Sequence, residues 1–220
     1  MESTINPDDP RKKLIDRIFK KCIEFTNTTL SSLNHNGVLL QSDSSYGLSE
    51  ININMLLFNN LIMQNEYKTS KSFMVDIEKN LSPGKRCDLF IKTKFNDILI
   101  IEVKYVKISF LEEIIKGYSD SQTLNEKLAL YSKMSRKISG LSKDEITQMK
   151  RLAVYNKSLT DKPLTNKYES IQEVLDNALI QAKGYAQTQS QYKFDNIYYC
   201  VVAGIGTTII ASDLILYKNT

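Results

Sequence analysis

The residues of this chain best suited to chemistry are Asp88, Glu102 and Lys104. They flank two short apolar runs, residues 89–91 and 98–101, which are joined by a turn containing Asn and Asp. Short apolar runs around such a turn predict a β-hairpin. Glu102 and Lys104 are two positions apart, so on a strand they point to the same face.

The length of the hairpin loop decides whether Asp88 joins that face. An odd-length loop, residues 94–96 or 93–97, pairs Asp88 with Glu102, whereas a two-residue loop pairs it with Val103 and turns it to the other side. Opposed side chains have Cβ atoms about 5 Å apart, and carboxylates that close repel unless a cation lies between them. A hard divalent cation takes oxygen ligands of this kind and supports phosphodiester hydrolysis. The alternative is a salt bridge at a sheet edge.

The same residues carry a resemblance to a known family. Asp88, thirteen intervening residues and then Glu102-Val103-Lys104 at the end of an apolar strand resemble the PD-(D/E)XK nuclease superfamily. The resemblance implies that Asp88, Glu102 and the carbonyl of Val103 bind Mg²⁺ or Mn²⁺. It also implies that Lys104 supports the attacking water. Cys87 stands where the family pattern has a proline.

A further acid is expected on the helix that precedes the hairpin. Residues 49–64 have a helical apolar pattern, with Ser49 as N-cap and Glu50 in the first turn. Many members of the superfamily have an acid on this helix that completes the metal site, which implies that role for Glu50. The alternative is an acid that only complements the helix dipole. Asp76 is a rival acid, which we expect to be exposed on an outer strand over residues 71–78.

A second motif lies near the C-terminus. Ser170-x-x-Glu173 is a capping box that opens a helix with a wide apolar face. Gln181 and Tyr185 are four apart, so they are neighbours on the helix surface. They match the Q-x-x-x-Y motif of RecB-like members, which implies that they bind nucleic acid or support the metal site. The alternative is the polar border of a helix packed on the sheet.

Composition sets the class of protein. The chain has 220 residues, 42% hydrophobic and 25% charged, which indicates one globular domain, with or without an insertion. The charge of +4 permits nucleic acid without demanding it. Three distant cysteines without a C-x-x-C favour an intracellular, reducing compartment, cytoplasm or nucleus, and no zinc site. No apolar run approaches about 18 residues, so we expect no membrane span.

The remaining pattern predicts an α/β fold with a mixed central sheet of about five strands flanked by helices, the restriction-endonuclease-like core. We divide the chain into an N-terminal helix and loop (1–48) and a nuclease-like domain (49–220) with a helical insertion at about 106–169. Helices are expected from Asp9-Pro10, over 108–117, over 122–139 and after the capping box at Ser142. Strands are expected at 197–202 and 207–217, around a turn at 204–206. His35 is expected in a loop, and 157–167 is expected to be a linker.

Two basic stretches leave a choice open. The first helix carries several Lys and Arg residues, and residues 127–157 hold eight Lys or Arg against two acids. Each is either a solvated surface or a contact for phosphate groups.

Together these features predict a Mg²⁺- or Mn²⁺-dependent endo- or exonuclease that acts on DNA in preference to RNA. As a base, Lys104 needs a pKa below its usual value of about 10.4; otherwise it acts as an electrostatic clamp. The alternative function is a catalytically silent nuclease-fold module that binds nucleic acid or a protein partner. A homodimer and a separate ATPase partner are both left open.

Overall fold

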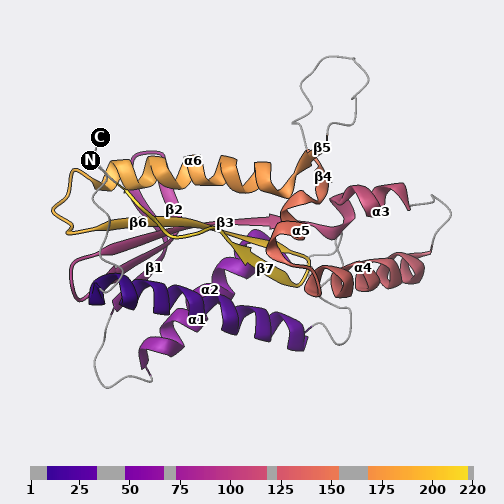
Figure 1. Cartoon of the computed structure of the whole chain (residues 1–220), viewed down its shortest axis with the longest axis horizontal. Helices are drawn as coiled ribbons and strands as arrows, with labels where there is room; N and C mark the ends of the chain where they lie inside the picture. Colours follow the sequence, from indigo (N-terminus) through magenta and orange to yellow (C-terminus); the bar gives the residue numbers. More distant parts are fainter. Residues whose placement is uncertain (1–8, 34–47, 67–72, 118–122, 154–167, 218–220) are drawn as a thin grey trace, which may run out of the picture.

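A mixed β-sheet with helices on both faces forms the centre of the molecule, as the sequence predicted (Figure 1). The computed structural model describes residues 9–33, 48–66, 73–117, 123–153 and 168–217. The strands of the sheet are β1 (Phe73–Ser82), β2 (Lys85–Thr93), β3 (Ile98–Val106), β6 (Ile197–Ile205), β7 (Thr208–Ala211) and β8 (Ile215–Leu216). They are ordered β1-β2-β3-β6-β7, and β8 also pairs with β6.

β3 and β6 are the only parallel pair among the described strands. Parallel strands need a long crossover. Here the crossover contains the segment predicted as a helical insertion, called the helical block below, and α6 (Ile171–Gln189). All nine residues of β6 are buried, as expected for a strand covered on both faces.

The two faces of the sheet have separate cores. Ile98 and Ile100 of β3 pack with Ala178 and Ala182 of α6. Their neighbour Leu99 packs on the opposite face with the helices α1 (Pro10–Leu33) and α2 (Glu50–Glu66). The N-terminal helix therefore belongs to the same folded unit as the sheet.

The β2–β3 hairpin has the odd-length loop that places Asp88 opposite Glu102. Leu89 pairs with Ile101, and this register continues without a shift to the turn. There the Thr93 N–H donates to the Asp97 carbonyl over 2.8 Å, so three residues form the loop. Asn96 has φ of 62°, a left-handed conformation that Asn tolerates well.

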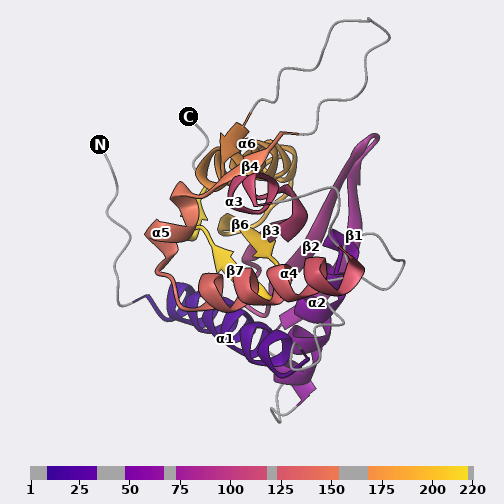
Figure 2. The ribbon, with the colours of Figure 1, turned by 90° about the vertical axis from the view of Figure 1, so that its right-hand side faces the viewer.

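The β1–β2 hairpin coils sharply at Glu78, whose φ of 52° interrupts the alternation of β1. Ile77 packs on the α1/α2 side, whereas Leu81 packs in the core under α6. The outer part of the hairpin consequently curls toward α6, where Lys85 donates to Thr188 over 3.1 Å (Figures 1 and 2). β1 is longer than predicted because Pro83-Gly84 joins β1 and β2 as a tight turn with Gly84 at φ of 73°.

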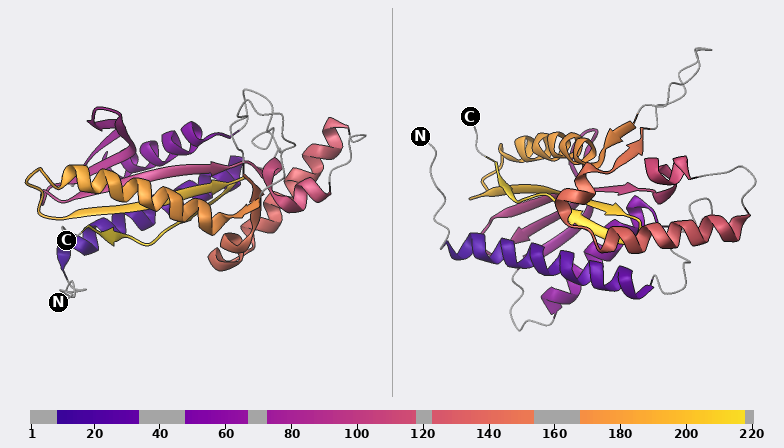
Figure 3. Two further views of the ribbon diagram at one scale, coloured as in Figure 1. Left: turned by 90° about the horizontal axis from the view of Figure 1, so that it is seen from above. Right: turned by 45° about the vertical axis from the view of Figure 1, so that its right-hand side comes forward.

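The helical block extends beyond one end of the sheet and shares the core under α6 (Figure 3). It contains η3 (Ile108–Phe110), α3 (Glu112–Lys116), α4 (Leu124–Ser139), α5 (Lys143–Gln148), β4 (Lys150–Leu152) and β5 (Tyr168–Ser170). The single helix predicted over 108–117 is broken because Leu111 is extended and bridges Arg151. The β4–β5 pair was not predicted. The capping boxes at Ser142 and Ser170 are confirmed.

The C-terminal strands differ from the prediction. β6 continues through Gly204 to Ile205, and the turn begins at Gly206, with φ of 58°. Gly204 allows a close approach inside the strand, because a Cβ there would lie 3.1–3.3 Å from side-chain atoms of Ile53 and Tyr105. The second strand is divided into β7 and β8. His35 and the predicted linker at 157–167 lie outside the described residues.

Candidate functional site

Asp88 and Glu102 meet where β2 and β3 separate. Alternate pairs of this ladder exchange backbone hydrogen bonds, so regular pairing would give the Val103 N–H to the Cys87 carbonyl. Instead, the Val103 N–H donates to Oδ2 of Asp88 over 2.7 Å. The Asp88 carboxylate thus takes the place of a backbone acceptor, and the ladder opens beside Glu102.

Glu102 is 2% exposed, and its two oxygens differ in their surroundings. Oε1 accepts a hydrogen bond from Nζ of Lys104 over 2.7 Å. Oε2 is buried and has no hydrogen-bond partner among the described residues. A buried carboxylate oxygen without a donor costs free energy, and here it lies beside the opened ladder.

Glu50 lies at the same place, at the start of α2. Its Oε1 is 3.7 Å from Nζ of Lys104, and its side chain is 45% exposed. Ser49 precedes it as the predicted cap, because the Asn52 N–H donates to the Ser49 hydroxyl over 3.3 Å. The cap therefore fixes the helix start that brings a third acid to the Lys104 ammonium.

Gln181 and Tyr185 lie on α6, and Nε2 of Gln181 donates to Oη of Tyr185 over 2.6 Å. Tyr185 is buried, whereas Gln181 is exposed. Burial raises the pKa of Tyr185, and the nearby charges of Glu102 and Asp88 raise it further. The Q-x-x-x-Y pair is therefore close to the acids, with its amide toward solvent.

The acids perturb one another. Burial is the main cause that raises the pKa of Glu102 to about 7, followed by the charges of Asp88 and Glu50, while Lys104 opposes the rise. Burial also raises the pKa values of Asp88 and Glu50. For Lys104, burial lowers the pKa, but the hydrogen bond to Glu102 and the surrounding negative charges outweigh it, so the pKa is raised. This direction favours the electrostatic clamp over the base.

The donor set fits a hard divalent cation with an incomplete protein shell. The described residues contain no group of three His, Cys, Asp or Glu side chains that could hold a metal by themselves. Mg²⁺, however, keeps several waters and commonly uses only one or two carboxylates with substrate phosphates. Asp88 and Oε2 of Glu102 can supply these two carboxylate ligands. The Val103 carbonyl points to the same side as its N–H, toward the opened ladder.

Sequence reasoning missed Asn54, which lies one helical turn after Glu50. It is 2% exposed, and its Nδ2 donates to the backbone carbonyl of Asp88 over a long 3.4 Å. Its Oδ1 is buried without a hydrogen-bond partner in the described ranges. The four-residue spacing from Glu50 was the available signal, since positions i and i+4 share a helix face.

The other charged residues singled out in the sequence, among those that the structure describes, lie outside the acidic site. Asp76 is 46% exposed and forms an ion pair with Lys79, so the rival acid stands apart as expected. Within the second basic stretch, several cations already have acidic partners: Lys137 with Glu113, Lys143 with Asp213, and Arg151 with Glu169. This pairing favours a structural surface for much of that stretch.

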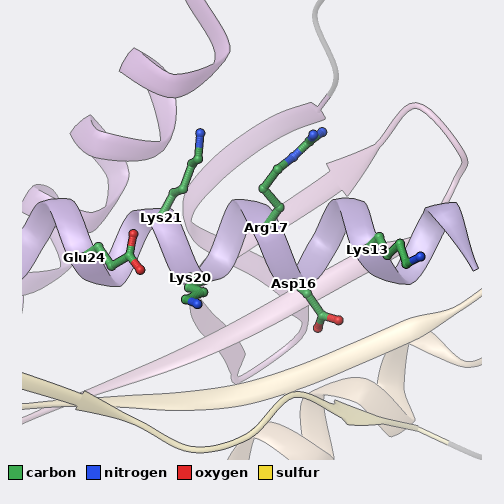
Figure 4. A pocket seen from close by; sticks show the side chains of 6 residues that line it. All are labelled: Lys13, Asp16, Arg17, Lys20, Lys21 and Glu24. Carbon is green, nitrogen blue, oxygen red and sulfur yellow. The ribbon is translucent and has the colours of Figure 1, made fainter. Parts of the chain in front are cut away.

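A shallow pocket follows α1 and is lined by Lys13, Asp16, Arg17, Lys20, Lys21 and Glu24 (Figure 4). Arg17 and Lys21, four residues apart, point the same way, while Asp16 and Lys20 point to the other side. All six lining residues belong to one helix, and none belongs to the acidic site. The pocket mixes both signs of charge, so a solvated helix face explains it.

The three cysteines are free and buried. None of the helices in the described ranges combines the length and apolar character that crossing a bilayer requires.

With this geometry defined, the chain was compared with known proteins. No protein-family model matches it, and no curated protein or solved structure gives a significant match.

Proposed function

We propose that this protein is a Mg²⁺- or Mn²⁺-dependent phosphodiester hydrolase of the PD-(D/E)XK type that acts on nucleic acid, with DNA preferred over RNA. One observation carries the proposal. Glu102 is buried opposite Asp88, with one oxygen on Lys104 and the other without a partner among the described residues. Unlike an ordinary structural ion pair, this one lies where the Asp88 carboxylate interrupts the β2–β3 ladder, and no hydrogen bond to the second oxygen repays its desolvation.

The roles follow from the contacts. Asp88, Glu102 and the Val103 carbonyl would hold the cation, with Glu50 as a further acid. When bound, the cation acts as a Lewis acid toward a phosphoryl oxygen and lowers the pKa of a water. Lys104 would orient a water through its ammonium, whose pKa is raised by the hydrogen bond to Glu102 and the surrounding acids. Gln181 presents its amide to the nucleic acid, held by its hydrogen bond to Tyr185.

The test is cleavage of circular plasmid, linear single-stranded DNA and RNA of matched sequence, with Mn²⁺ or Mg²⁺ added. We expect nicking or degradation that falls at least about 100-fold in Asp88→Asn and in Lys104→Ala, since removing one preorganised charged group commonly costs that much. Asp76→Asn is the matched control, because Asp76 is an acid of the same sheet outside the site. Full cleavage by Asp88→Asn and Lys104→Ala would refute the proposal.

A second function has its own observation. In the described residues Lys104 lies within ion-pair distance of both Glu102 and Glu50, so its ammonium can neutralise the acids without a metal. That arrangement suits a catalytically silent nuclease fold that binds nucleic acid or a protein partner. Thermal unfolding with and without Mn²⁺ separates the two, because only a protein with a metal site gains stability from the ion.

A further inference from the structure

The strongest unexplained feature near the acids is the buried amide of Asn54. α2 otherwise meets the sheet with apolar side chains such as Ile53 and Leu57, both fully buried. A buried amide in such a helix costs free energy unless its polar atoms are paired. Asn54 has one long hydrogen bond, to the Asp88 carbonyl, and an oxygen without a partner in the part of the chain that the structure describes.

A second asparagine of the same helix shows what structural use looks like. Asn60 is partly buried, and its Nδ2 donates to the Thr26 hydroxyl of α1 over 2.8 Å. That bond links α2 to α1 and accounts for an asparagine at this position. Asn54 instead reaches the backbone of Asp88, on the same helix face as Glu50. The Asn54 amide is therefore linked to the Asp88 backbone and not to α1.

The surroundings of Asn54 Oδ1 indicate which kind of donor it would accept. Asn54 Oδ1 and Glu102 Oε2 are both buried acceptors, and both residues adjoin Asp88. An acceptor beside ionised acids requires a donor that carboxylates do not supply. A divalent cation carrying waters supplies such donors, because its bound waters form strong hydrogen bonds to nearby oxygens that do not themselves bind the metal.

We propose that Asn54 is a positioning residue of the metal site: its amide N–H holds the Asp88 backbone, and its carbonyl oxygen accepts a hydrogen bond from a water of the bound cation. The proposal rests on the function proposed above, because it requires that the acids bind a divalent ion. It adds a residue of α2, buried behind the acids, to the set that determines metal affinity.

The experiment measures Mn²⁺ binding to the full chain by titration calorimetry, together with thermal unfolding in chelator and in Mn²⁺. Asn54→Leu keeps the size of the side chain and removes both polar atoms, while Asn54→Asp keeps an oxygen at the same place. Asn60→Leu is the matched control, since it removes an amide of the same helix that contacts Thr26.

We expect Asn54→Leu to weaken Mn²⁺ binding about 10-fold or more, the usual effect of losing a residue that hydrogen-bonds to the ligands of a metal. In chelator its melting temperature should stay unchanged or rise, because a buried atom without a partner has been removed. Asn54→Asp should bind Mn²⁺ within about threefold of the wild-type affinity. Asn60→Leu should show the reverse pattern, with a lower melting temperature and unchanged affinity.

The outcomes separate the two proposals. If the wild type does not bind Mn²⁺, the proposed metal-dependent function fails. If the wild type binds and Asn54→Leu binds equally well, the function stands and the role of Asn54 is overturned. Equal weakening in Asn54→Leu and Asn54→Asp also overturns it, because the oxygen then has no part. Should Asn54→Leu not fold, Asn54→Ala, which also removes both polar atoms, replaces it under the same criterion.

Discussion

The apolar run of β3 has a buried acid at each end, and the two acids have different surroundings. Asp97 is 0% exposed and Glu102 is 2% exposed, and each has one oxygen without a partner among the described residues. Asp97 accepts from Nδ2 of Asn196 over 2.8 Å. Arg11 lies 4.0 Å from it and forms a closer pair with Asp195. Asp97 therefore belongs to a network that ties the turn to the start of β6.

At the Glu102 end, backbone pairing between β2 and β3 stops, while β3 stays paired with β6, and carboxylates face one another. Asp88 stands opposite Glu102 and takes the Val103 N–H, while Glu50 approaches from α2. Lys104 is the cation in the centre of these acids. The comparison shows that a buried acid is not sufficient evidence for a site. The distinguishing features are an opened ladder and several acids around one opening.

The largest expected difference between the two ends is catalytic. Glu102→Gln should reduce Mn²⁺-dependent cleavage at least about 100-fold, because it removes a charge that we propose to hold the cation. Asp97→Asn should leave cleavage within about twofold, since it keeps an oxygen for Asn196 and lies outside the site. Initial rates on plasmid DNA measure both. Equal losses in the two variants would contradict the distinction between the ends.

Substitutions at the two ends should also differ in their effect on stability, with the larger loss at the Asp97 end. Asp97→Ala leaves the Asn196 amide without its acceptor and should lower the free energy of unfolding by about 1–3 kcal/mol. In chelator, Glu102→Gln should be as stable as the wild type or more stable, because mutual repulsion among the acids is relieved. Urea denaturation measures both, with the exposed Asp213→Ala as control. A larger loss for Glu102→Gln than for Asp97→Ala would reverse our interpretation.

Backbone strain should also differ between the ends. Glu78 adopts φ of 52° opposite Asp88, a conformation that costs most residues about 1–2 kcal/mol. Glu78→Gly should therefore raise the free energy of unfolding by up to about 1 kcal/mol, reduced by loss of the Arg86 ion pair. Asn96→Gly, at φ of 62°, should lower it by about 1 kcal/mol, because the hydrogen bond to the Lys193 carbonyl is lost. Matched urea curves would show whether the signs are opposite.

The smallest expected effect is a pH dependence at the structural end. Burial raises the pKa of Asp97 above its ordinary value, so folding is favoured while the group is protonated. This contribution is complete below the unfolded-state pKa and is lost as pH rises through the folded-state value. Asp97→Asn should therefore gain stability relative to the wild type between pH 3 and pH 7. If the difference in unfolding free energy between the two proteins stays the same across this range, the pKa of Asp97 is not raised.

Much of the fold was predictable because its signals are local. Capping boxes at Ser142 and Ser170 place helix starts within a few residues, and apolar runs around an Asn/Asp turn specify a hairpin. The break at Leu111 and the β4–β5 pair were missed because both depend on a contact with a distant segment. Gly204 was assigned to a turn, since its role depends on Ile53, far away in the sequence.

In the candidate site, too, local features were predictable and features that depend on distant segments were not. The sequence by itself determined that Glu102 and Lys104 share a face of β3, because strand alternation is a property of the local backbone. It left two registers open for Asp88, and only the folded hairpin selected the one that opposes Glu102. The open ladder at Val103, the approach of Glu50 and the buried amide of Asn54 were decided by tertiary structure. These features depend on how α2 and the coiled hairpin pack against β3, and sequence spacing does not encode such packing.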